Sequence, residues 1–183
     1  MRKTEVRQIA EKCGFVNADK PDSQDICFVP NGDYASVIEL QTGKQSAGGN
    51  FVDKQDNVLG QHKGVIHYTI GQRKGLGISS SQSLYVCKIC PKSGNVVLGS
   101  DADLFRTEAD VSDFNWISGS VSQGEFRCKA KIRYRQPEQW ATVTSIGENT
   151  VHIVFDEAQR AITPGQAAVL YDGDIVLGGG TIK

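Results

Sequence analysis

The sequence lacks any apolar run that approaches the roughly 20 residues needed to cross a bilayer. Its polar start, MRKTEVRQ, is not a signal peptide. A formal net charge of −1 predicts no polyanionic partner by itself. The five cysteines are odd in number and scattered, which fits a reducing compartment better than a disulfide framework. We therefore expect an ordinary cytoplasmic protein that does not associate with membranes.

Motifs for nucleotides and metals are also missing. No G-x-x-x-x-G-K-[ST] sequence is present, and GQRKGLG (residues 71–77) does not match the dinucleotide fingerprint. Cys87 and Cys90 form a lone C-x-x-C whose members would point to opposite faces of a strand, so no zinc site is predicted. Three scattered histidines have neither metal-ligand spacing nor a triad partner and are interpreted as structural: His62, His67 and His152.

The N-terminal part of the sequence predicts two short helices. Residues 4–13 place several apolar side chains on one face, and Cys13, which lies on that face, is expected to pack in a core. That face begins almost at residue 1, so we expect the chain to be part of a longer protein. The second helix is predicted within residues 31–40, with Asn31 or Asp33 as its cap.

The remainder predicts a mainly β protein, with a small central domain followed by an antiparallel barrel. Hairpins are expected at 50–60 and 84–100, a strand at 64–70, and a domain boundary in the acidic segment 100–112. Five further strands are predicted, at 126–135, 139–146, 151–155, 166–171 and 174–182. In TPGQ, Pro164 and Gly165 suit the central positions of a type II turn.

The segment RCKAKIRYR is the most informative local pattern. Five cations alternate with apolar residues, namely Arg127, Lys129, Lys131, Arg133 and Arg135 against Cys128, Ala130, Ile132 and Tyr134. In a strand, all five cations would lie on one face, about 6.6 Å apart, and the apolar set would point into the barrel. This basic face could bind RNA phosphates, or it could simply be solvated and protect a sheet edge.

Two other segments leave alternatives open. The glycines of residues 71–77, with Arg73 and Lys74, allow close approach of a phosphate, although the motif alone favours a tight connection between strands. Cys27, in PDSQDICFVPNG, lies between a polar turn and an apolar run. It is either a buried core residue or an accessible thiol that does chemistry.

Several long strings, in order along the chain, resemble the bacterial and organellar tRNA-specific 2-thiouridylases, which place sulfur on C2 of the wobble uridine. They are KTEVRQIAEKCGF, KPDSQDICFVP, GQHKGVIHYTIGQRKGLGI, RYRQ, TPGQAAVLY and GDIVLGGGTI. Members of that family begin with an adenylating PP-loop domain that carries S-G-G-x-D-S and a first catalytic cysteine. Neither motif occurs here.

The resemblance implies a division of this chain into three parts. Residues 1–30 would be the end of the catalytic domain, 31–105 the central domain, and 106–183 the tRNA-binding barrel. The parent enzyme would use ATP with Mg²⁺, whereas this chain alone would hold no cofactor and would be inactive. The expected partners are tRNA and a sulfur-relay donor protein, and the chain is expected to be a monomer.

The resemblance also implies roles for individual residues. Cys27 would carry the persulfide, Arg133 and Tyr134 would contact tRNA, and Gln166 would lie near the substrate end of the tRNA. We extend the tRNA-binding role to further cations by pattern alone, and least strongly to the last two: Arg127, Lys129, Lys131, Arg135, Arg73 and Lys74. The alternatives are a non-catalytic RNA-binding barrel with an inert Cys27, or a structural segment whose basic strand faces solvent.

Overall fold

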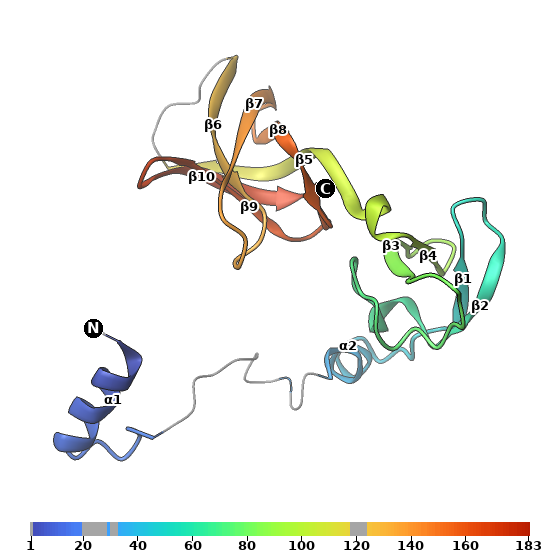
Figure 1. Ribbon diagram of the computed structural model, residues 1–183, viewed down its shortest axis with the longest axis horizontal. Helices are drawn as coiled ribbons and strands as arrows, with labels where there is room; N and C mark the ends of the chain where they lie inside the picture. Colours follow the sequence, from blue (N-terminus) through green and yellow to red (C-terminus); the bar gives the residue numbers. More distant parts are fainter. Residues whose placement is uncertain (1, 20–28, 30–32, 118–123) are drawn as a thin grey trace. The chain divides into compact units, whose positions relative to one another are not determined.

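The computed structural model describes residues 2–19, 29, 33–117 and 124–183 (Figure 1). The chain divides into two compact units, one up to Gln45 and the other from Ser46 to Lys183. Within the described residues, no helix is both long and apolar enough to cross a membrane.

The first unit contains the two predicted helices, α1 (Lys3–Lys12) and α2 (Tyr34–Thr42). The Asp33 carboxylate caps α2 by accepting from the Ser36 amide at 3.2 Å, as predicted for one of the two candidate caps. No residue of α1 is buried, and Cys13, which follows it, is exposed. The expectation that Cys13 packs in a core is therefore wrong for the described residues, because its helix has an exposed apolar face.

The second unit begins with a four-stranded sheet in the order β2-β1-β4-β3. Its strands are β1 (Gly49–Val52), β2 (Val58–His62), β3 (Tyr85–Cys90) and β4 (Asn95–Gly99). The two predicted hairpins are confirmed, and β1 pairs with β4 in parallel. The strand predicted at 64–70 is wrong. Val65–His67 forms the 3₁₀ turn η2, and its Val65 packs on the sheet instead of pairing along an edge.

The glycine loop, residues 71–77, is part of this sheet's framework. Gly71, Gly75 and Gly77 all have positive φ, between 68° and 87°, which side chains other than glycine rarely adopt. The Gly71 amide donates to the Val86 carbonyl at 2.8 Å, and Leu76 is buried in the core of the sheet. The glycine spacing is therefore explained by the turns that the loop makes along β3.

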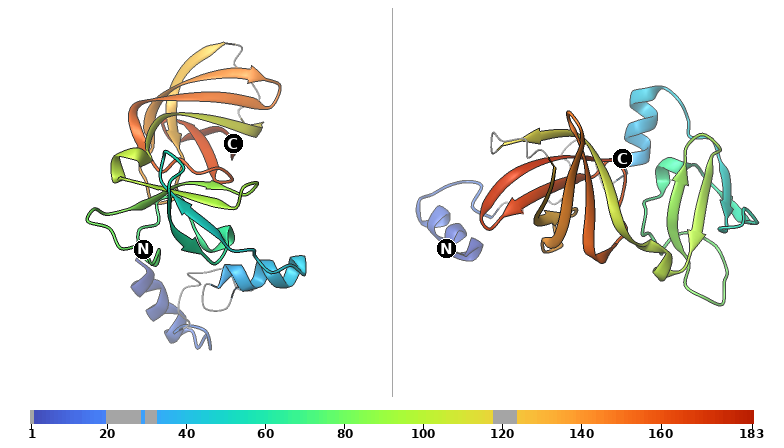
Figure 2. Two further views of the ribbon diagram at one scale, coloured as in Figure 1. Left: turned by 90° about the vertical axis from the view of Figure 1, so that its right-hand side faces the viewer. Right: turned by 90° about the horizontal axis from the view of Figure 1, so that it is seen from above.

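The rest of the second unit is a closed six-stranded barrel in the order β10-β5-β8-β7-β6-β9, which confirms the predicted antiparallel barrel (Figure 2). Its strands are β5 (Phe105–Trp116), β6 (Glu125–Lys131), β7 (Gln139–Gly147), β8 (Thr150–Arg160), β9 (Ala167–Asp172) and β10 (Ile175–Ile182). Five of these strands were predicted, but β5 was not: most of its residues were assigned to an acidic domain boundary. Its inward Ala109, Val111 and Phe114 are buried, whereas its acids face outward and hid the strand pattern.

The sheet and the barrel share contacts around the 3₁₀ turn η3 (Asp101–Leu104). The Arg160 guanidinium, at the end of β8, donates to the Asp101 carboxylate at 2.8 Å. It also lies 5.5 Å from the centre of the Tyr85 ring. The Ala161 amide donates to the Leu104 carbonyl at 2.8 Å. These contacts connect the end of β8, just before the Thr163–Gln166 turn, to the sheet through η3.

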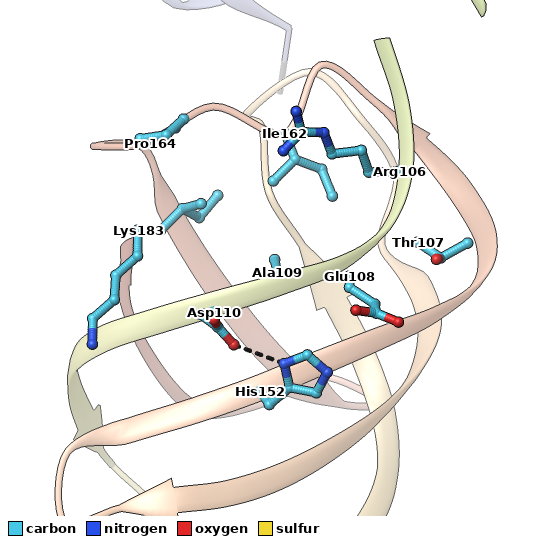
Figure 3. Close-up of a pocket in the computed structure, with 10 residues that line it drawn as sticks. Arg106, Thr107, Glu108, Ala109, Asp110, His152, Ile162, Pro164 and Lys183 are labelled. Carbon is cyan, nitrogen blue, oxygen red and sulfur yellow. Dashed lines mark hydrogen bonds and ion pairs between the residues drawn. The ribbon is translucent and has the colours of Figure 1, made fainter. Parts of the chain in front are cut away.

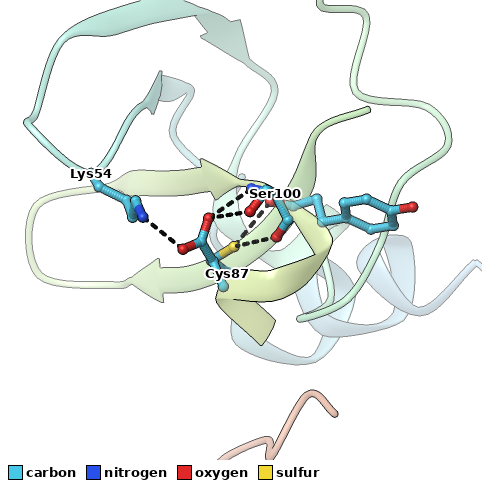
Figure 4. Close-up of polar contacts among 5 residues, drawn as sticks. Lys54, Cys87 and Ser100 are labelled. Carbon is cyan, nitrogen blue, oxygen red and sulfur yellow. Dashed lines mark hydrogen bonds and ion pairs between the residues drawn. The ribbon is translucent and has the colours of Figure 1, made fainter. Parts of the chain in front are cut away.

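A polar cluster stabilises the start of η3 (Figure 4). Lys54 Nζ lies 2.6 Å from Asp103 Oδ1, and the Ser100 hydroxyl and amide donate to Asp103 Oδ2 at 2.7 and 2.8 Å. The hydrogen bond from Lys54, followed by those from Ser100, lowers the pKa of Asp103 to about 2. Cys87 lies beside this cluster, with its thiol 3.4 Å from the Tyr85 carbonyl oxygen.

This cluster predicts a pH-dependent stability. Because the pKa of Asp103 is lower in the folded chain than its ordinary value of 3.8, its stabilisation is complete above about pH 4. It is lost as the pH falls from about 4 to about 2. We expect Asp103→Asn to lower the urea midpoint at pH 7 and to converge with the parent chain near pH 2. Asp174→Asn, which removes the same charge elsewhere, should leave the midpoint unchanged. An equal deficit of Asp103→Asn at both pH values would contradict this assignment.

Candidate functional site

A cavity of about 370 Å³ lies on the barrel between the end of β6 and the start of β9. It brings together Arg133, Tyr134 and Gln166, which were predicted from the resemblance. It also includes one cation predicted from the basic pattern, Lys131. Its lining comprises Lys131, Ile132, Arg133, Tyr134, Gln166, Ala167, Val169 and Tyr171. We call it the β6–β9 pocket.

The first side of the β6–β9 pocket is the turn that follows β6. The strand ends at Lys131, the Gln136 amide donates to the Arg133 carbonyl at 3.2 Å, and Pro137 cannot donate to a neighbouring strand. The prediction of a single basic face over residues 127–135 is therefore wrong, because Arg133 and Arg135 lie in a turn. Tyr134, predicted to point into the barrel, is 93% exposed.

The second side is the Thr163–Gln166 turn. Gly165 has a φ of 84°, and the Gln166 amide donates to the Thr163 carbonyl at 3.2 Å, as the predicted type II turn requires. The turn is fastened to β10, since Gly165 donates to the Ile182 carbonyl and Ile182 donates to the Gln166 carbonyl. These backbone bonds fix Gln166 while its exposed side chain remains at the pocket.

Arg133 links the two turns. Its Nη2 donates to the Ala161 carbonyl at 2.9 Å and to the Thr163 hydroxyl at 3.1 Å. Among the described residues, two buried side-chain polar atoms have no hydrogen-bond partner, Arg133 Nε and Gln136 Oε1. Both belong to RYRQ. Buried polar groups are nearly always satisfied, so this segment has hydrogen-bonding capacity that the described residues do not use.

The other predicted cations differ in their partners. Arg127 makes a bidentate bond with Asp156, with both N–O distances at 2.6 Å, and Lys129 lies 3.3 Å from Glu138. In the part of the chain that the structure describes, no carboxylate lies within 4 Å of the Lys131 or Arg135 cationic groups. The cations at one end of β6 are thus paired directly with carboxylates, whereas Lys131 and Arg135, toward the β6–β9 pocket, form no ion pair among the described residues.

Arg73 and Lys74 are exposed on the glycine loop of the sheet. Arg73 lines a different cavity, of about 590 Å³, formed mainly by residues 75–84. Neither residue lines the β6–β9 pocket, so the structure does not bring them together with Arg133, Tyr134 and Gln166.

Tyr171 was not identified as a site residue from the sequence. It lies in β9 directly opposite Lys129 of β6, and it lines the β6–β9 pocket beside Val169. The two strands are separated by about 40 residues, and only their pairing brings these side chains together. No local pattern in QAAVLY carries this information.

A third cavity, of about 550 Å³, lies over β5 and β8 (Figure 3). The Asp110 carboxylate lies 2.7 Å from Nδ1 of His152, and Arg106, Glu108 and Lys183 also line it. Side chains of both charge signs line this cavity, and no predicted site residue is among its lining residues. The described residues contain no group of three or more His, Cys, Asp or Glu side chains arranged to hold a metal ion.

Cys27 lies outside the described residues, so its role stays a prediction. The four other cysteines are free thiols: Cys13, Cys87, Cys90 and Cys128. Burial raises the pKa of Cys128 to about 11, and it also raises the pKa of Cys87. Both are therefore protonated at neutral pH, and a protonated thiol is a poor nucleophile.

Three family models match the chain in succession. A "tRNA methyl transferase HUP domain" matches residues 1–31, a "tRNA methyl transferase PRC-barrel domain" 38–100, and an "Aminomethyltransferase beta-barrel domain" 106–182. The sheet lies within the second match and nearly the whole barrel within the third. Fold and matches together place the chain in the class of proteins that these three models describe, whose names refer to tRNA methyl transferases and aminomethyltransferases.

Curated relatives specify the family. The chain is 49% identical over 181 residues to the tRNA-specific 2-thiouridylase MnmA of Clostridioides difficile, covering 99% of this chain and 50% of the relative. It is 47% identical over 181 residues to that of Acetivibrio thermocellus, with the same coverage. The chain belongs to the tRNA-specific 2-thiouridylase family. It spans about half the length of the curated relatives it matches.

Proposed function

We propose that this chain is the tRNA-binding and sulfur-accepting portion of an enzyme that thiolates C2 of the wobble uridine. One observation supports the tRNA-binding part above all others. The β6–β9 pocket gathers Lys131, Tyr134 and Gln166, from two segments about 30 residues apart in sequence, at one place on the barrel.

The groups of this pocket suit an RNA ligand. Lys131 can pair with a phosphate, which positions the RNA without reading its sequence. The exposed ring of Tyr134 offers a stacking surface for an unpaired base, as aromatic side chains do in other single-strand-binding barrels. The side-chain amide of Gln166 can both donate a hydrogen bond to a base edge and accept one from it. Arg133 supports these contacts by holding the two turns together.

Sulfur transfer is proposed to depend on Cys27. The C2 oxygen of uridine leaves poorly until it is esterified, and ATP supplies that activation in the parent enzyme. The terminal sulfur of a Cys27 persulfide then attacks C2, the C2–O bond breaks and AMP leaves. The remaining S–S bond is cleaved by a second cysteine of the parent enzyme, which forms a disulfide with Cys27. After a thiol reductant has opened this disulfide and restored the Cys27 thiol, a sulfur-relay protein would reload Cys27, and the whole enzyme would act in the cytoplasm.

The tRNA-binding part predicts a salt-dependent affinity. Titration of the 183-residue chain with tRNA should show binding whose log affinity falls linearly with log salt. The slope magnitude should be about 0.7–0.9 for each phosphate contacted. Tight binding that ignores salt, or no binding at low salt, would overturn this part of the proposal. ATP should not raise the melting temperature of this chain, whose sequence carries no adenylation motif.

A further inference from the structure

The outer face of the barrel carries an aromatic row beside the β6–β9 pocket. Strand pairing places Trp140 of β7 opposite Lys129 of β6, and Lys129 opposite Tyr171 of β9. Directly paired residues point to the same face, so these three side chains form one row, with the two aromatic backbones about 10 Å apart. We call it the Trp140 row.

Trp140 is not explained by core packing. It is 53% exposed, whereas the adjacent Ala141, which points inward, is fully buried. The Arg127 guanidinium carbon lies 5.7 Å and Lys129 Nζ 5.8 Å from the centre of the Trp140 ring. Both distances are at the outer limit of cation–π contact, about 6 Å. The indole is therefore steadied by two cations while about half of the residue remains accessible.

The two cations are themselves held by carboxylates. Asp156 binds Arg127 through two bonds and Glu138 lies beside Lys129, so these side chains keep defined positions. Lys131, one row further along β6, has no such partner among the described residues and lines the β6–β9 pocket. Tyr171 belongs both to the Trp140 row and to that pocket. The row therefore continues the pocket across three strands.

This combination favours RNA as the occupant. Every base has a π face that can stack on an indole, and the cations that flank the ring can reach the phosphates on either side of the stacked nucleotide. Because two of the cations are already paired with acids, charge alone would bind weakly here. Stacking on Trp140 would supply the larger part of the contact.

We infer that the Trp140 row is a second RNA contact, which stacks one unpaired nucleotide of the tRNA on Trp140 while the β6–β9 pocket holds a neighbouring part of the strand. This inference rests on the proposed tRNA-binding function. A nucleotide in a continuous duplex keeps its base stacked between its neighbours, so the row should distinguish unpaired from paired RNA.

The chain contains two tryptophans, Trp116 and Trp140, which makes the contact measurable. Trp116→Phe leaves Trp140 as the single indole, and phenylalanine retains the aromatic packing on Phe114 and Phe126. Titration with tRNA should quench the fluorescence of Trp140, and the midpoint of this quenching should match the midpoint of tRNA binding. A fully paired RNA duplex of similar length should leave the emission unchanged.

Substitutions then test the energetic role. Trp140→Ala should weaken tRNA binding at least about five-fold, the lower end for loss of one base–aromatic stack, and Trp140→Phe should restore most of that loss. Thr144→Ala, on the outward side of the same strand and away from the row, is the matched control. Circular dichroism verifies folding of each variant.

The outcomes separate the two proposals. Unquenched Trp140 emission with parental affinity in Trp140→Ala would overturn the second contact while leaving the tRNA-binding function intact. Equal quenching by duplex and by tRNA would overturn the preference for an unpaired base. Failure of the unsubstituted chain to bind tRNA would overturn both.

Discussion

Treatment with a persulfide donor is expected to add one sulfur atom to Cys27 and essentially none to the other four cysteines. Cys87 and Cys128 resist because burial raises the pKa of each thiol, to about 11 for Cys128. A persulfide forms from the thiolate, so these two stay unreacted at pH 7. Mass spectrometry of intact chain and of tryptic peptides identifies the loaded residue.

Cys13 provides the matched control for this experiment, because it is an exposed free thiol. Cys27→Ser should abolish the added mass, whereas Cys13→Ser should leave it unchanged. Equal loading of Cys13 and Cys27 would favour the alternative function, an RNA-binding barrel whose Cys27 is inert. Loading of Cys128 would contradict the raised pKa and the closed barrel core in which it lies.

The second large effect is expected at the β6–β9 pocket. The double substitution Lys131→Glu with Tyr134→Ala should weaken tRNA binding at least ten-fold. It should also lower the magnitude of the salt slope by about one, because one phosphate contact is lost. Neither side chain is buried, so the melting temperature should change little. Lys92→Glu, in the exposed turn between β3 and β4, alters the same charge on the sheet and should retain parental binding.

Arg133 should respond differently from its neighbours. Arg133→Ala removes a donor to the Ala161 carbonyl and to Thr163, which should cost about 1–3 kcal/mol of stability as well as tRNA affinity. Calorimetry separates this structural effect from a loss of direct contact. Reduced affinity with an unchanged melting temperature would mean that Arg133 contacts RNA itself.

The sequence of β6 predicts which of its side chains are buried but not where the strand ends. Alternation of cations and apolar residues correctly predicts that Cys128, Ala130 and Ile132 are buried. It does not reveal where the strand ends, because alternation continues through Tyr134 although Pro137 and the 133–136 turn stop the pairing. Arg133 was thus predicted to lie in a strand, whereas it lies in a turn. That Arg133 and Gln166 line the same pocket could be seen only in the folded structure.

The strand β5 and the residue Tyr171 illustrate the other limit. Outward acids gave residues 105–116 the composition of a linker, and only closure of the barrel explains why Ala109, Val111 and Phe114 are buried. Tyr171 and Trp140 become neighbours of Lys129 through pairings between distant strands. Sequence periodicity specifies which face a residue lies on, but it does not specify the partner strand.

Ala161 connects the 3₁₀ turn η3, where the sheet and the barrel share contacts, with the β6–β9 pocket through its own peptide groups. Ala161 has a φ of 56°, its amide bonds to the Leu104 carbonyl, and its carbonyl accepts from Arg133. Neither bond at this residue uses its methyl group. Engineers who exchange barrels between relatives should therefore keep the left-handed conformation at this position, together with the Arg160–Asp101 ion pair beside it.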